Sequence, residues 1–264
     1  MSSQNDIAKS FKALHNPGTP LIVTNVWDAI TAKIIAELPN TKAIATASYA
    51  VAAAAGLADD DLTLEVNLRA VAAIAKVAQQ FNKPLTVDFQ DGFGDQLEDG
   101  IRQVIKLGAV GINLEDFSRE LKGLYPISDA QDRIRRVLRV AEEEGVPDFV
   151  VNARTDALFA GADLSEAIAR GKAYLAAGAA NIFIWGGPTR KGWSREEVEQ
   201  AVKALDGKLN VILIRLVPGG LSVKELSEIG GTGVARISVG PQLMLRTAGL
   251  IGEEASKILA GEGI

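Results

Sequence analysis

The sequence predicts an α/β fold, a single (β/α)8 TIM barrel domain over residues 1–264, from three observations. The chain has 264 residues, of which 47% are hydrophobic, so it can enclose a large core within one domain. Short apolar runs alternate with longer amphipathic segments along its length. There are eight such runs, which is the number of strands in a closed barrel of this kind.

Each apolar run is nearly continuous, as expected for parallel strands that are buried on both faces. The runs are LIVTNV from Leu21, AIATAS from Ala43, LTVDF from Leu85, AVGINL from Ala109, FVVNA from Phe149, IFIW from Ile182, LNVILI from Leu209 and VARISV from Val234. Helical periodicity fills the intervals, for example over Val66–Gln80 and Ala130–Glu144. We also expect an extra N-terminal helix over residues 2–14 and an eighth helix over Pro241–Leu259.

An open doubly wound sheet is the alternative arrangement of the same elements. Such a sheet typically carries a G-x-G-x-x-G turn after an early strand, where backbone amides bind phosphate. Here Asn25-Val26-Trp27-Asp28 follows the first run instead. The sequence therefore favours the closed barrel.

Composition excludes several kinds of chemistry. The chain has no cysteine, which rules out disulfides, thiolate metal sites and cysteine nucleophiles. The only histidine is His15, expected in a surface loop, so a multi-histidine metal site or a histidine-based triad is impossible. The net charge is −5 and no basic tract stands out, which argues against a nucleic-acid partner.

The sequence also gives no sign of a membrane partner. The N-terminal segment lacks the apolar core of a signal peptide. The alanine-rich stretch Ala43–Ala55 is too short and too polar to span a bilayer. We therefore expect a cytoplasmic protein.

Acidic residues follow several of the apolar runs. Active sites of (β/α)8 barrels lie at the C-terminal ends of the strands. Carboxylates follow the first, third, fourth and fifth runs. The clearest site candidates are Asp88 and Glu115, because they lie within or just after apolar runs, where an unpaired charge costs free energy. Ionised acids around one mouth repel each other and need a cation among them. Without His or Cys ligands, that cation is expected to be Mg²⁺, with Mn²⁺ as the alternative.

Arg154 follows the fifth run, in NARTD. A guanidinium at a barrel mouth matches a substrate carboxylate through two parallel hydrogen bonds. An ion pair with a barrel acid is the alternative role for this residue. Thus a small-molecule carboxylate is the expected partner.

Seven short motifs occur in order along the chain: NVWDA (Asn25–Ala29), IATAS (Ile44–Ser48), G-x-x-D (Gly56–Asp59), VDFQDGFG (Val87–Gly94), GINLED (Gly111–Asp116), NARTDAL (Asn152–Leu158) and VARISVGP (Val234–Pro241). Together they resemble the isocitrate lyase/phosphoenolpyruvate mutase superfamily. The resemblance implies a barrel whose last helix is often exchanged between subunits of a homodimer or homotetramer. It also implies Mg²⁺ and a 2-oxo or 2-hydroxy acid, with cleavage or rearrangement of a C–C or P–C bond beta to the carboxylate.

The resemblance assigns roles to individual positions. The metal ion would be held by Asp88, Glu115 and Gln90. Gln90 stands where the family motif has an acid. Asp59 would be a further acid, and Arg154 would bind substrate. Further substrate contacts would come from Thr46, Ala47, Ser48 and Asn113.

The segment after the fourth run departs from the family pattern. Lyases of this superfamily carry a catalytic cysteine there, in K-K-C-G-H, but Phe117–Tyr125 contains neither Cys nor His. Lys122 and Tyr125 are the candidate proton donors, with a solvated loop as the alternative. Trp185 and Arg215 are unusual residues at strand ends. Arg215 could neutralise a second anionic group, or form an ion pair with a neighbouring acid.

Three functions therefore compete. The first is a Mg²⁺-dependent lyase that forms a pyruvate-type enolate by cleaving a C–C bond. The second is a P–C bond mutase or hydrolase of the phosphonopyruvate type. The third is a barrel that binds oxo acids without catalysis.

Overall fold

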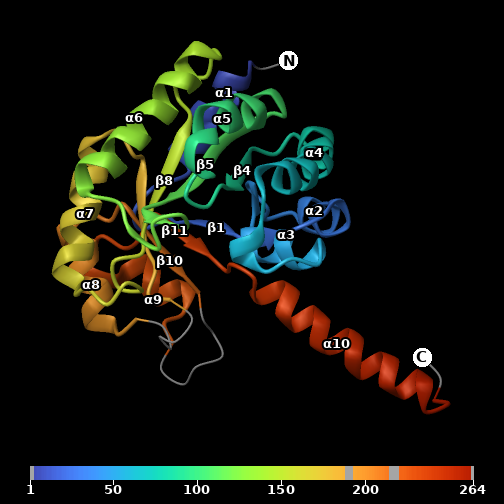
Figure 1. The fold of residues 1–264 in the computed structure, drawn as a ribbon. Helices are drawn as coiled ribbons and strands as arrows, with labels where there is room; N and C mark the ends of the chain where they lie inside the picture. Colours follow the sequence, from blue (N-terminus) through green and yellow to red (C-terminus); the bar gives the residue numbers. More distant parts are fainter. Residues whose placement is uncertain (1–2, 188–192, 214–219, 263–264) are drawn as a thin grey trace.

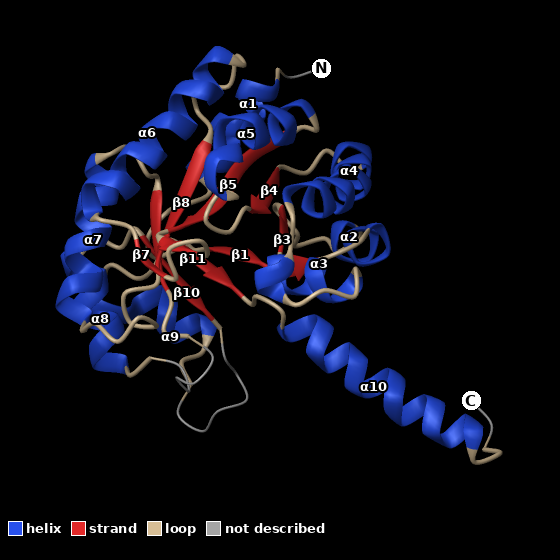
Figure 2. Cartoon of the chain, viewed as in Figure 1, coloured by secondary structure: helices blue, strands red, loops and turns tan. Residues whose placement is uncertain are grey.

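The structure is a computed structural model that describes residues 3–187, 193–213 and 220–262. Its main sheet is entirely parallel, and helices surround it (Figures 1 and 2). The strands are β1 (Leu21–Val23), β2 (Asn25–Val26), β3 (Ile44–Thr46), β4 (Leu85–Asp88), β5 (Ala109–Glu115), β8 (Val150–Thr155), β9 (Asn181–Ile184), β10 (Leu209–Ile212) and β11 (Arg236–Ser238). Every predicted apolar run overlaps at least one of them.

The strand order shows how the sheet curves into a barrel. It runs β1-β11-β10-β9-β8-β5-β4-β3-β2, so β1 and β2 stand at the two ends of the order. These two short strands are separated only by Thr24, and they are two halves of the first predicted run. β1 pairs with β11 while β2 pairs with β3, so the two edges of the sheet meet within one segment of chain. This confirms the barrel and excludes the open sheet.

Asn25 strengthens the seam where the barrel meets itself. Its Nδ2 donates to the carbonyl oxygen of Thr46 on one side, at 2.7 Å. Its Oδ1 accepts from the backbone nitrogens of Val239 and Gly240 on the other side, at 3.1 and 2.9 Å. The side chain is buried, so these bonds are made away from competing water.

The helices follow the predicted alternation. The outer ones are α2 (Ala29–Ala36), α3 (Ser48–Ala54), α4 (Leu64–Gln80), α5 (Leu97–Lys106), α6 (Ile127–Glu143), α7 (Leu164–Ala176), α8 (Arg195–Ala204) and α9 (Val223–Glu228). Short 3-10 turns are η1 (Asp59–Asp61), η2 (Gly94–Gln96) and η3 (Ile229–Gly231). Side-chain caps fix several starts: the Asp28 carboxylate accepts from the Thr31 nitrogen at 2.7 Å at the start of α2.

An N-terminal helix, α1 (Gln4–Ala13), covers the N-terminal ends of β5 and β8. Its Phe11 is fully buried beside Gly111 of β5. His15 lies in the loop that follows this helix, as expected, but it is half-buried, and its Nδ1 donates to the Phe11 carbonyl oxygen at 3.0 Å. Burial lowers the pKa of His15 to about 3, so the ring is neutral. The extra helix therefore closes the end of the barrel opposite the strand C-termini.

The last helix, α10 (Gln242–Leu259), projects away from the barrel (Figure 1). None of its residues is buried, and its large apolar side chains are exposed: Leu245, Leu250, Ile251, Ile258 and Leu259. Several exposed large apolar side chains on one helix are typical of an interaction surface. Among the described residues, no helix has both the length and the apolar character needed to cross a membrane.

Replacing Gly111 by Ala should lower the free energy of unfolding by about 1–3 kcal/mol, because a well-packed core does not accept an extra methyl group. A Cβ there would lie 2.8 Å from the Val150 carbonyl oxygen and 2.9 Å from Phe11 Cε1. Urea unfolding curves of the two proteins measure the change.

Gly123→Ala is the matched control, because a Cβ at that position meets nothing closer than 3.8 Å. It should leave the urea midpoint nearly unchanged. Equal midpoints for both variants would show that α1 does not pack against β5 as described.

Candidate active site at the C-terminal mouth of the barrel

Asp88, the last residue of β4, is held by the neighbouring strand and turn. Its backbone nitrogen donates to Thr46 Oγ1 at 2.8 Å, and its Oδ2 accepts from the Ser48 nitrogen at 2.9 Å. On the other side, Asn113 Nδ2 approaches its Oδ1 at 3.4 Å. Thr46, Ser48 and Asn113 therefore all contact the acid that the sequence assigns to the metal, and Ala47 lies buried between two of them.

Gln90 and Asp59 form a second contact across the mouth. Gln90 Nε2 donates to both Oδ1 and the carbonyl oxygen of Asp59, each at 2.9 Å. Gln90 adopts a left-handed backbone conformation, with φ of 46°, and its Oε1 is buried without a partner among the described residues. Burial raises the pKa of Asp59, and the nearby negative charge of Asp88 raises it further.

Arg154 lies at the centre of the mouth, near the end of β8. Its Nε and Nη2 donate to the two carboxylate oxygens of Asp156, at 2.6 and 3.0 Å. Its Nη1 donates to Glu115 Oε1 at 2.7 Å. The Trp185 ring covers the guanidinium at 4.1 Å, and the Phe183 ring lies 5.7 Å away. The ion-pair role considered for Arg154 is therefore present in the structure.

The same geometry leaves part of the guanidinium of Arg154 available. A guanidinium has five N–H groups, and the three bonds to Asp156 and Glu115 use three of them. One N–H therefore remains on each of Nη1 and Nη2. That pair matches the two oxygens of a further carboxylate.

Burial and mutual repulsion determine the charge state of the acids at the mouth. Burial raises the pKa of Glu115 well above its usual range, Arg154 opposes this, and Asp156, Asp88 and Asp59 add to it. Burial also raises the pKa of Asp156, against the opposing charge of Arg154. The mouth therefore holds more acids than its one central arginine balances, and an added cation would relieve the excess.

The predicted donors on the segment after β5 lie apart from these acids. That segment contains the hairpin of β6 (Phe117–Ser118) and β7 (Gly123–Leu124), with Lys122 exposed at its turn. The Tyr125 ring packs under Arg133, whose guanidinium lies 4.7 Å from the ring centre. In the described part of the chain, no contact joins Lys122 or the Tyr125 ring to Asp88, Glu115 or Arg154.

Arg119 ties the hairpin to the rim of the barrel. Its Nη1 donates to the carbonyl oxygens of Asp60 and Leu62, both at 2.9 Å. Its backbone nitrogen donates to Oδ2 of the buried Asp91 at 3.2 Å. Sequence reasoning did not select Arg119 or Asp91 as site residues. A charged pair split between two loops leaves no periodic signal in a sequence.

Aromatic side chains line the same rim. The Phe117 and Phe159 rings lie 5.3 Å apart, and Phe159 lies 5.3 Å from Trp185. Trp185 is thus joined both to Arg154 and to the hairpin. Arg215, the other unusual residue at a strand end, lies outside the described residues.

The residues at the mouth fit Mg²⁺ by donor type, since they offer hard oxygen atoms and excess negative charge. Across the described ranges, no three acidic, histidine or cysteine side chains cluster closely enough to form a complete ligand set. Mg²⁺ usually retains several waters and needs only one or two carboxylates, so such a set is not required.

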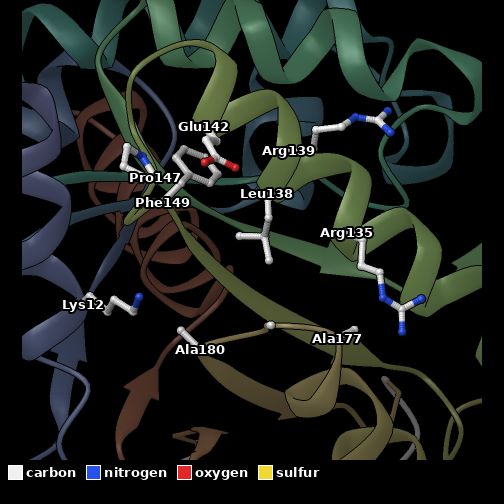
Figure 3. Close-up of a pocket in the computed structure, with 10 residues that line it drawn as sticks. Lys12, Arg135, Leu138, Arg139, Glu142, Pro147, Phe149, Ala177 and Ala180 are labelled. Carbon is white, nitrogen blue, oxygen red and sulfur yellow. The ribbon is translucent and has the colours of Figure 1, made fainter.

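A separate cavity of about 360 Å³ lies at the other end of the barrel (Figure 3). It opens between α6, α1 and the residues that precede β8 and β9, with Phe149 and Ala180 among its lining residues. Arg135 and Arg139 extend outward at its edge (Figure 3). None of the strand-end residues described above lines this cavity, so we do not assign the reaction to it.

Replacing Glu115 by Gln should stabilise the metal-free protein more at pH 8 than at pH 5. The pKa of Glu115 is higher in the folded protein than its ordinary value of 4.5. Its contribution to folding stability is therefore complete below pH 4.5 and is lost as the pH rises through the folded-state pKa. The amide does not ionise, and Arg154 keeps Asp156 as a partner. Melting temperatures across this pH range measure the difference.

Glu98→Gln is a control of opposite sign. Arg136 lowers the pKa of Glu98 through a side-chain hydrogen bond, so the variant should be less stable than the parent at neutral pH. This deficit should disappear as acid protonates Glu98 in the parent. A pH-independent effect of the Glu115 change would contradict the raised pKa.

Comparisons with known proteins place this arrangement in a family. The family model for phosphoenolpyruvate phosphomutase matches residues 11–259. The 2-methylisocitrate lyase of Escherichia coli is 31% identical over 185 residues, which cover 66% of this chain and 60% of that protein.

Two solved structures share the fold. That of 2,3-dimethylmalate lyase is 25% identical with a TM-score of 0.81, covering 98% of this chain and 88% of the other. That of phosphonopyruvate hydrolase in complex with oxalate and Mg²⁺ is 25% identical with a TM-score of 0.81, covering 97% and 88%. The chain therefore belongs to the phosphoenolpyruvate phosphomutase family, within the isocitrate lyase/phosphoenolpyruvate mutase superfamily of enzymes that act on oxo acids and phosphonopyruvate.

Proposed function

We propose that this protein is a Mg²⁺-dependent carbon–carbon lyase acting on a small 2-oxo or 2-hydroxy acid. The observation that carries the proposal is the unused pair of N–H groups on Arg154, which lies among the acids Glu115, Asp156 and Asp88. This combination provides one group for a substrate carboxylate and a negative site for a cation next to it.

The relatives support both parts of the proposal. Two of them are lyases by name, 2-methylisocitrate lyase and 2,3-dimethylmalate lyase. The phosphonopyruvate hydrolase structure contains oxalate and Mg²⁺ together. Oxalate has the planar, doubly oxygenated shape of a pyruvate enolate, which is the species expected when the bond beta to the carboxylate breaks.

In this mechanism each residue has a role that follows from its contacts. Arg154 binds the substrate carboxylate through its two remaining N–H groups, and Trp185 limits the position of that carboxylate by covering the guanidinium. Asp88, Glu115 and Gln90 would hold the ion directly or through water. Bound Mg²⁺ would supply a Lewis acid for the charge that develops on the 2-oxo oxygen.

The turn after β3 would complete the substrate site. Thr46, Ala47 and Ser48 are buried beside Asp88, and Asn113 reaches the same carboxylate. Asp59 is the acid best suited to exchange a proton with the substrate, because its raised pKa favours the protonated form. Lys122 and Tyr125 remain alternatives that would require the hairpin to move.

A P–C bond mutase or hydrolase is the second candidate, favoured by the phosphonopyruvate hydrolase relative. A phosphonate needs cations to balance its charge. Among the described residues, Arg119 at the rim is already engaged with Asp91, and Arg170, in the layer that supports the mouth, is engaged with Asp116. This favours the carbon–carbon reaction. The exchange of pyruvate C3 protons for deuterium, described below, distinguishes the lyase from the non-catalytic alternative.

We also propose that the protein is a homodimer or homotetramer in which α10 packs on a second subunit. Its exposed apolar side chains, including Leu250 and Ile251, have no cover within the described residues of one chain. Burial against another copy would remove this surface from water.

The purified protein with Mg²⁺ should exchange the C3 protons of pyruvate for deuterium in D₂O, because enolisation is the shared step. Arg154→Lys should slow this exchange by about 100-fold, since an ammonium cannot reproduce the paired hydrogen bonds. Proton NMR follows the exchange.

Arg136→Lys is the matched control, because Arg136 pairs with Glu98 on the outer helices. It should exchange at the parental rate. Oxalate binding without any proton exchange would support the non-catalytic alternative and reject the lyase. Release of phosphate from phosphonopyruvate, with no cleavage of C–C substrates, would favour the second candidate.

Gln90→Glu should tighten Mg²⁺ binding by about tenfold, because it adds a negative charge beside Asp59 at the mouth. Isothermal titration calorimetry with MgCl₂ measures the affinity. Gln131→Glu on α6 adds the same charge away from the mouth and should leave the affinity unchanged. Equal affinities for the Gln90 variant and the parent would remove Gln90 from the proposed metal site.

A further inference from the structure

Part of the interior of this barrel is polar, whereas branched apolar residues fill most barrels of this type. Residues two apart on a strand face the same side, so the inward set can be followed along each strand. It includes Thr86, Asn113, Asn152, Asn181, Asn210 and Arg236, all buried.

Three of the asparagines form a chain that leads inward from the mouth. Asn113 Oδ1 accepts from Asn152 Nδ2 at 2.8 Å, and Asn152 Oδ1 accepts from Asn181 Nδ2 at 3.0 Å. Asn113 Nδ2 points to Asp88 Oδ1 at 3.4 Å. The chain therefore begins at a carboxylate of the candidate site. At its inner end, Asn181 Oδ1 has no partner among the described residues.

Arg236, the first residue of β11, is the largest fully buried side chain in the described structure. Its inward direction follows from Ser238, two residues later, whose Oγ accepts from Asn210 Nδ2 at 3.0 Å. Its Nε and Nη1 lack partners within the described ranges. Burial lowers the pKa of Arg236 to about 10, and the charge of Asp88 opposes that shift, so the group stays cationic at neutral pH.

The unpartnered atoms around Arg236 are of both kinds. The guanidinium offers donors, while Asn181 Oδ1 and Asn210 Oδ1 offer acceptors. His15 Nε2 is also an acceptor, because Nδ1 must donate to the Phe11 carbonyl oxygen. A bound anion would satisfy the donors but would be repelled by the acceptors. Water satisfies both, and buried charges require such solvation.

We propose that ordered water molecules inside the barrel solvate Arg236, and that this buried cation weakens the binding of the divalent ion at the mouth through its charge. The affinity part rests on the proposed function, because it requires Mg²⁺ to bind near Asp88. Arg236 then limits, through its charge, how tightly the ion is held at the mouth.

The first test is a high-resolution crystal structure of the parent protein. Water should lie within hydrogen-bonding distance of Arg236 Nε or Nη1 and bridge to Asn181 or Asn210. A dry interior, with those atoms still unpartnered, would overturn the hydration part whether or not Mg²⁺ binds.

The second test is calorimetric titration of Mg²⁺ into Arg236→Met. Removing a buried positive charge should tighten Mg²⁺ binding by about three- to tenfold, and Arg236→Lys, which keeps the charge, should retain the parental affinity. A purely structural defect would weaken binding in both variants or leave it unchanged. Unchanged or weaker binding in Arg236→Met therefore rejects the proposed charge effect.

Arg236→Gln provides a second neutral variant if the methionine variant does not fold, and the same tightening is expected. Absence of Mg²⁺ binding to the parent protein would instead reject the proposed function, and the affinity role with it. The two failures are therefore distinguishable.

Discussion

The gathering of acids around a single arginine is the constraint on which the rest of this structure depends. Closing the sheet brings the ends of β4, β5 and β8 to one mouth, so Asp88, Glu115 and Asp156 share a space that excludes most water. Arg154 holds two of these carboxylates directly. In such surroundings charges interact strongly, and the raised pKa values of Glu115 and Asp156 show that one guanidinium does not balance them. A cation and an anionic substrate can then bind together, because each compensates the other.

A second layer of interactions supports this arrangement without reaching the mouth. Asp116 accepts from Tyr174 Oη at 2.6 Å and pairs with Arg170 at 3.2 Å. Its other oxygen accepts from the Asp156 nitrogen at 2.8 Å. Asp116 therefore fixes the backbone that carries the acid partner of Arg154. Orientation of this kind, with the groups held before substrate arrives, is what electrostatic stabilisation of a transition state requires.

The segment after β5 shows how a family site can change while its frame persists. The hairpin has no cysteine, and Arg119 fastens it to Asp91 and to the backbone at Asp60 and Leu62. The aromatic contacts of Phe117 and Phe159 extend this attachment to Trp185. The hairpin thus places apolar and paired groups at the rim, with no cysteine or histidine among them. For this reason the proposed mechanism assigns proton exchange to Asp59.

The barrel could be predicted from the sequence, because each of the eight strands is buried on both faces and must therefore be apolar. It also identified Asp88, Glu115 and Arg154 as strand-end residues, since the C-terminal ends of parallel strands meet at one edge. It did not give the partners of these groups. The pairing of Arg154 with Asp156 and Glu115, the bond from Gln90 to Asp59 and the anchoring of Arg119 join elements from different loops. These contacts become visible only in the folded chain, because they depend on distances between segments that no local pattern of residues encodes.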